Sequence, residues 1–157
     1  MKPALVLVAA AAVLVGAGSA SSRASHATGC GPLLRLPRTT PAGQIVLFGH
    51  IVSLKRNGAR YEMRFDPALW LTGVTASRAK LEDTGSSDVP NDYYIRDLDH
   101  RLLSFHVPAT APVTVLRRGT CTTRTSVAAL ARSASRAGFW IRVRNDVVQS
   151  LDQQYQP

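Results

Sequence analysis

From residue 44 onward, apolar and polar positions follow patterns that predict a sheet-rich domain. The run 44–54 is rich in β-branched and large apolar residues. After it, Tyr61, Met63 and Phe65 alternate with charged residues. Asn57-Gly58 between the two runs favours a type I′ turn, because both residues tolerate a positive φ. We therefore expect the domain to open with a β-hairpin whose second strand has one apolar and one charged face.

The same patterns predict five further strands and two short helices. The strands cover 93–96, 102–107, 113–117, 139–144 and 147–151. Asp66-Pro67 is typical of a helix start, with an N-cap followed by proline, and predicts a helix to about Lys80. Thr125-Ser126 predicts the cap of a second helix over 127–136. The stretch 82–92, rich in acids, Gly, Ser and Pro, is typical of a surface loop.

These elements indicate an α+β fold class. We expect a small, mostly antiparallel β-barrel or curled sheet of about seven strands with two short helices. The length allows one hydrophobic core, so residues 44–157 are predicted to form a single globular domain. Residues 21–43 are rich in Ser and Pro and are expected to form a flexible leader.

The first twenty residues have the features of a secretory signal peptide. Lys2 gives a positive start, 5–15 is an unbroken apolar run, and Gly18-Ser19-Ala20 is a small-residue cleavage pattern. The run is shorter than the about 20 apolar residues that cross a bilayer, so we expect cleavage and no transmembrane segment afterwards. Lipidation of Cys30, after Gly29, stays open as an alternative. The chain is predicted to be secreted.

Two cysteines, Cys30 and Cys121, follow the signal peptide. In an oxidising compartment such a pair predicts a disulfide bond. It would close most of the mature chain into a loop, which stabilises by about 4 kcal/mol in the chain-entropy model. A reactive or metal-binding pair would need further His or Cys ligands nearby, which the sequence does not place there.

The chain is strongly basic, with 19 Lys and Arg against 10 Asp and Glu and a net charge of +9. Such a surface attracts polyanions. Arg117, Arg118 and Arg124 flank Cys121 and could form one patch for an anionic cell-envelope polymer or glycan. The alternative is a solvated surface with dispersed charges. Nucleic acid is not expected as a partner of an exported protein.

The sequence holds no nucleophile elbow, phosphate loop or paired metal histidines. Asp92, Asp99 and His100 lie in turns around the strand 93–96 and form the candidate acid/base group of a small secreted hydrolase or transferase. Turn chemistry explains the same residues. No cofactor or metal is predicted.

A binding role has more support. Asn91, Asp92, Tyr93 and Tyr94 would lie on one rim of the domain and the arginines on another. Aromatic stacking with anion contacts suits a glycan, a peptide or an envelope polymer. We therefore favour a non-catalytic binding module that acts at or beyond the cell envelope.

Several short blocks carry a resemblance to a known group. They are Arg64-Phe65-Asp66-Pro67-Ala68, Leu71-Thr72-Gly73, Glu82-Asp83, Val89-Pro90-Asn91-Asp92-Tyr93-Tyr94-Ile95, Phe139-Trp140-Ile141 and Asp152-Gln153-Gln154-Tyr155. With them the chain resembles a group of secreted actinobacterial proteins that carry no functional assignment. The resemblance covers nearly all of the mature chain. It implies an extracytoplasmic location and a shared fold, and it implies no activity.

Overall fold

The computed structural model describes residues 40–97, 99–117, 119–133 and 137–156. The predicted signal peptide, nearly all of the leader, Cys30 and Arg118 lie outside these residues. Within the described ranges, no helix is both long and apolar enough to span a membrane.

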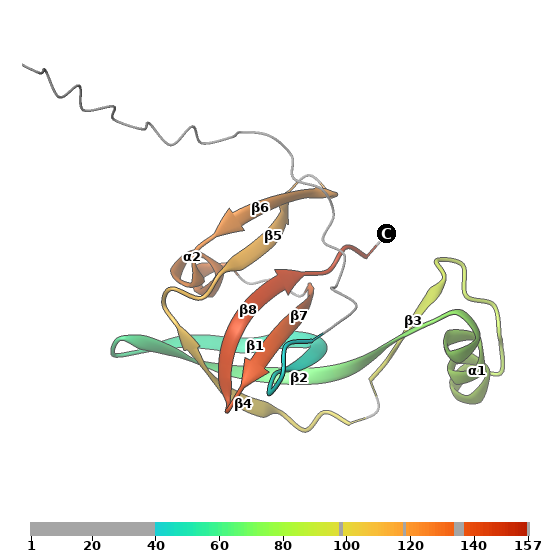
Figure 1. Cartoon of the computed structure of the whole chain (residues 1–157). Helices are drawn as coiled ribbons and strands as arrows, with labels where there is room; N and C mark the ends of the chain where they lie inside the picture. Colours follow the sequence, from blue (N-terminus) through green and yellow to red (C-terminus); the bar gives the residue numbers. More distant parts are fainter. Residues whose placement is uncertain (1–39, 98, 118, 134–136, 157) are drawn as a thin grey trace, which may run out of the picture.

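The described residues form a sheet-rich α+β fold with a mixed sheet of eight strands (Figure 1). The strands are β1 (Ile45–Asn57), β2 (Arg60–Thr72), β3 (Tyr93–Arg96), β4 (Leu103–Pro108), β5 (Val113–Arg117), β6 (Cys121–Thr125), β7 (Gly138–Arg144) and β8 (Val147–Gln153). The helices are α1 (Gly73–Thr84) and α2 (Val127–Arg132).

The strand order is β3-β2-β1-β7-β8-β5-β6, and β4 pairs with both β2 and β8. The pairings of β8 with β4 and β5 are parallel, and the other strand pairs are antiparallel. β1 and β2 are the longest strands, at 13 residues each. Figure 1 shows β2 running from the hairpin turn out to β3 and α1, far from α2. The two helices therefore lie at different ends of the sheet.

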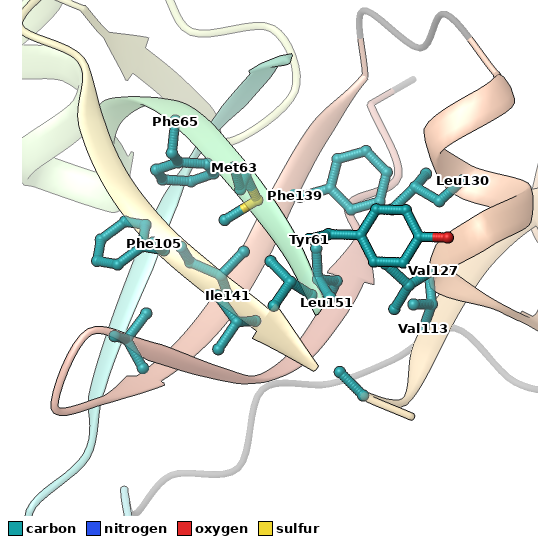
Figure 2. Packing of buried hydrophobic residues seen from close by; sticks show 14 residues of the cluster. Tyr61, Met63, Phe65, Phe105, Val113, Val127, Leu130, Phe139, Ile141 and Leu151 are labelled. Carbon is teal, nitrogen blue, oxygen red and sulfur yellow. The ribbon is translucent and has the colours of Figure 1, made fainter. Parts of the chain in front are cut away.

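One hydrophobic core fills the curl of the sheet (Figure 2). Tyr61, Met63 and Phe65 of β2 are all buried, which confirms the apolar face predicted from their alternation. β7 contributes three more buried residues, Phe139, Ile141 and Val143, as its alternation predicts. Figure 2 shows Met63 and Phe65 at one end of the cluster and α2, with Val127 and Leu130, at the other.

Several local predictions are confirmed. β1 and β2 form the opening hairpin, with Asn57 paired to Arg60 and Gly58 at a φ of 60° in the turn. β3 and β5 have the predicted bounds. Ser126 caps α2, because its side chain accepts a hydrogen bond of 3.1 Å from the Ala129 N–H.

The predicted helix start at Asp66-Pro67 is wrong. Both residues belong to β2, where Asp66 pairs with His50 and Pro67 with Gly49. The local signal for a helix is overridden because β1 is long enough to keep its partner extended. A Cβ on Gly49 would lie 2.1 Å from the Asp66 carbonyl oxygen, so only glycine allows the strands to approach this closely. α1 therefore begins at Gly73.

Two further differences concern α1 and β6. Glu82 and Asp83 belong to α1 and not to a loop, and the helix ends at Gly85, whose φ is 77°. β6 is an additional strand that the pattern of apolar residues does not predict, and it raises the number of strands from the expected seven to eight. Its threonines favour a strand, but the segment is short and has no large apolar residue.

The approach of the strands at Gly49 generates a stability prediction. Gly49→Ala forces β1 and β2 apart, and we expect the free energy of unfolding to fall by about 1–3 kcal/mol, the usual cost of overpacking. Denaturant unfolding measures this change. Val52→Ala is the control, because Val52 is 55% exposed on the same strand and its loss should cost within about 0.5 kcal/mol. Equal stabilities of the two variants would contradict the prediction.

Candidate functional site

A stripe of four aromatic rings crosses the face of the sheet that points away from the core. Cross-strand partners lie on one face of a sheet, and so do alternate residues of a strand. Phe48 of β1 pairs with Ala68 of β2 and with Trp140 of β7. Trp70 lies two residues after Ala68 on β2. Tyr93 of β3 pairs with Thr72, which lies two residues after Trp70. Tyr93, Trp70, Phe48 and Trp140 therefore share this face, and we call them the aromatic stripe.

The four rings are in contact from one strand to the next. Trp70 stacks on Tyr93 with ring centroids 4.2 Å apart and planes 7° apart. Phe48 lies 5.1 Å from Trp70 and 5.0 Å from Trp140, between centroids. Phe48 is buried, whereas Trp70, Tyr93 and Trp140 are each partly exposed. The stripe is thus a surface feature with one buried ring at its centre.

Small and polar residues hold the stripe in place. A Cβ on Gly138 would lie 2.5 Å from the Phe48 ring, so glycine leaves the space that this ring occupies. The Trp140 indole N–H donates a hydrogen bond of 2.7 Å to the Gln154 side chain. The Gln154 backbone N–H donates in turn to the Gly138 carbonyl at 2.9 Å. The segment after β8 is therefore bonded to this face.

The three predicted acid/base residues do not come together. Asp92, with a φ of 57°, precedes β3, while Asp99 and His100 follow it. Four residue steps of extended chain span about 13 Å, which separates Asp92 from Arg96 at the far end of β3. Asp99 accepts a hydrogen bond of 3.0 Å from the Arg101 N–H, a turn contact. His100 instead lies 3.6 Å from Asp66 and 3.6 Å from Asp97, between side-chain atoms.

The predicted tyrosine rim is divided between two faces. Asn91 and Asp92 are exposed in the turn before β3, and Tyr93 joins the stripe. Tyr94 faces the other side, where its hydroxyl donates a hydrogen bond of 3.2 Å to Asp83 of α1. Arg96 lies on the same side and contacts Asp83 at 2.6 Å and Glu82 at 3.1 Å. Tyr94 and Arg96 thus attach α1 to β3.

The predicted arginine patch is not formed by its described members. Arg117 pairs with Cys121 and Arg124 with Thr114 along the hairpin of β5 and β6. Alternation then places Arg117 and Arg124 on opposite faces of the hairpin. Arg118 lies outside the described residues. No described cysteine is free, and the bond between Cys121 and Cys30 stays a prediction, because Cys30 lies outside these residues.

A polar cavity of about 450 Å³ lies on the outer side of β1, β2 and β4. The Arg64 guanidinium donates a hydrogen bond of 3.2 Å to the Ser104 hydroxyl there. His106 also lines the cavity, and its Nδ1 has no hydrogen-bond partner among the described residues. The contact of Ser104 is thus with an arginine, which does not activate a hydroxyl as a base would.

We compared the chain with known proteins: no protein-family model, no curated protein and no solved structure matches it. Functional inference therefore depends on the geometry of the described residues.

The sequence does not predict Phe48, Trp70 or Trp140 as functional residues. The predicted helix from Asp66 to about Lys80 includes Trp70, and the place of Trp70 on the stripe follows only because β2 continues to Thr72. The signal that could have found it is the alternation of Asp66, Ala68 and Trp70, which is the period of a strand.

The contacts of Tyr94 generate a prediction of pH dependence. Loss of hydration, followed by the hydrogen bond to Asp83 and the charge of Asp83, raises the pKa of Tyr94 above its ordinary value. The neutral phenol is favoured in the folded state, so this stabilisation is present below a pH of about 10 and is lost as the pH rises through the raised pKa. Absorbance of the phenolate during an alkaline titration measures the shift. We expect Asp83→Asn to lower this pKa and Tyr94→Phe to remove the transition. An unchanged titration in Asp83→Asn would contradict the part of the shift that we assign to Asp83.

Proposed function

We propose that the protein is a secreted, non-catalytic binding module whose aromatic stripe binds a glycan at or beyond the cell envelope. The observation that carries this proposal is the contact of four rings across four strands, away from the core, with three of the rings partly exposed. Apolar side chains gathered on a solvent-facing surface favour a binding role. The signal peptide, the extracytoplasmic location and the disulfide bond belong to the same proposal.

Aromatic rings suit a glycan because a sugar ring has apolar C–H faces and polar edges. An aromatic ring covers the C–H face and removes it from water, while the hydroxyl groups stay free for hydrogen bonds. The rings of the stripe are also rigid, since each contacts its neighbour. Little conformational entropy is then lost when a ligand orders this surface.

Polar side chains border the stripe and supply candidate partners for hydroxyl groups. His50 and Asp66 form the cross-strand pair next to Phe48 and Ala68 on the same face. Asp152 of β8 pairs with Trp140 at the other end of the stripe. Hydrogen bonds from such groups fix the orientation of a ligand, and the aromatic rings provide contact area.

The charge of the chain has a secondary role in this proposal. A net charge of +9 attracts an anionic envelope at low salt. Because Arg117 and Arg124 lie on opposite faces of their hairpin, this attraction is spread over the surface. It should be screened at high salt, unlike stacking on aromatic rings.

We also propose that the sheet closes into a small barrel. The pairings lead from β1 to β2, β4, β8 and β7 and return to β1. The step from β4 to β8 is the shortest, with His106 paired to Val147 and a bond of 2.9 Å from the His106 N–H to the Asp146 carbonyl. A curved sheet closed in this way presents the stripe on its outer surface.

Co-sedimentation with isolated cell envelopes across a salt series tests the binding proposal. We expect the oxidised mature chain to stay bound in about 1 M salt, where the Debye length is about 3 Å. Tyr93→Ala and Trp70→Ala should each weaken this retention about three- to tenfold, the worth of an aromatic pair contact. Release of the wild-type chain at the same salt as an unrelated protein of matched charge would refute the proposal.

Tyr94→Ala is the matched control. It removes the same side chain from the next residue of β3, which faces α1 and not the stripe. Retention at high salt should be unchanged in this variant, and thermal unfolding checks that all variants are folded. The double variant Arg117→Gln, Arg124→Gln should bind less at low salt, where charge attraction contributes, and should match the wild-type chain at high salt.

A further inference from the structure

We propose that Asp66, Asp97 and His100 bind a divalent transition-metal ion, with zinc as the first candidate. One imidazole nitrogen and two carboxylate oxygens from these residues lie within 4.8 Å of one another. This inference is separate from the proposed function, because metal binding needs no glycan; of the three residues, only Asp66 also borders the aromatic stripe.

The fold brings the three residues together from distant positions in the chain. Asp66 lies on β2, four residues before Trp70, and Asp97 directly follows β3, two residues after Ile95. Ile95 pairs with Trp70, so alternation places both carboxylates on the same face of the paired strands. His100 returns from the segment after β3 to reach both of them. The cluster therefore lies on the same face as the aromatic stripe.

The distances fit a metal ion better than direct hydrogen bonds. His100 Nδ1 lies 3.6 Å from Asp66 Oδ2 and 3.6 Å from Asp97 Oδ1. A hydrogen bond between nitrogen and oxygen is shorter, at about 2.7–3.2 Å. Tetrahedral zinc with ligands at about 2.0–2.2 Å places neighbouring ligand atoms about 3.4 Å apart. The three ligand atoms lie within 4.8 Å of one another, so the cluster must contract to complete three ligand positions.

Each carboxylate of the cluster also has one buried oxygen without a donor, which on Asp97 is the oxygen nearest to His100 and on Asp66 is the other oxygen. Asp66 Oδ1 and Asp97 Oδ1 are both shielded from water, and neither has a hydrogen-bond partner among the described residues. The Asp66 side chain is only 17% exposed. A buried carboxylate oxygen without a donor is costly unless a cation compensates it. Arg96, which directly precedes Asp97, is engaged by Glu82 and Asp83 on the other face, and Arg64, two residues before Asp66, donates to Ser104.

The types of ligand indicate which ion fits. Imidazole suits zinc and other first-row transition metals, and two carboxylates supply the negative charge that a divalent cation requires. Calcium takes six to eight oxygen ligands and seldom accepts imidazole nitrogen. Three protein ligands also leave a position open to water or to an oxygen of a bound molecule. His100 is 76% exposed, so an ion can reach the cluster from solvent.

Isothermal titration calorimetry of the mature, tag-free, chelator-treated chain with zinc chloride tests the site. We expect one zinc ion per cluster, and at least tenfold weaker binding at this site in both His100→Ala and Asp97→Asn. Because His100 is exposed in a turn, its replacement should leave the fold intact, which thermal unfolding without metal checks. Zinc should raise the melting temperature of the wild-type chain and not that of His100→Ala.

Asp99→Asn is the matched control, since Asp99 is an exposed acid of the same segment outside the cluster. It should bind zinc like the wild-type chain, as should His26→Ala, which removes a histidine of the leader. Three results would overturn the proposal: no zinc binding, binding that His100→Ala and Asp97→Asn leave unchanged, or tighter binding of calcium than of zinc. Each is measured without envelopes, so failure here is distinct from failure of glycan binding.

Discussion

The pairing of β1 with β2 is the constraint on which the rest of the structure depends. It continues past the core because Gly49 lets β1 approach the Asp66 carbonyl oxygen and Pro67. A side chain at position 49 would force the two backbones apart at this point of the pairing. The extension provides the edge on which β3 pairs, and β3 in turn holds α1 through Arg96 and Tyr94.

The extended β2 carries residues of the core and residues of the proposed binding surface on opposite faces. Near the hairpin turn, β2 directs Tyr61, Met63 and Phe65 into the core. Further along, the opposite face of the strand carries Asp66 and Trp70. Residues on this outer face are therefore not needed to fill the core, which allows them to serve a ligand. The proposed metal cluster and the proposed glycan surface both depend on this one strand, and an open metal position beside the stripe could contact a bound molecule.

The sequence predicted best where a pattern is local and regular. Tyr61, Met63 and Phe65 alternate strictly, so their burial could be read from the sequence alone. Asp66-Pro67 was misread because a local helix signal competes with a pairing to β1 that lies about 16 residues away. The stripe and the His100 cluster could not be predicted for the same reason. Each joins residues from several strands, and only the register of those strands decides which of them meet.

The chain has only two tryptophans, Trp70 and Trp140, and both lie in the aromatic stripe. Their ring centroids are 6.2 Å apart, so both indoles share one environment. The tryptophan fluorescence of the protein therefore originates from the outer face and not from the hydrophobic core. A change in tryptophan emission at a lower temperature than the unfolding of the sheet would show that this face unfolds locally first. The native chain therefore reports on its outer face without any added label.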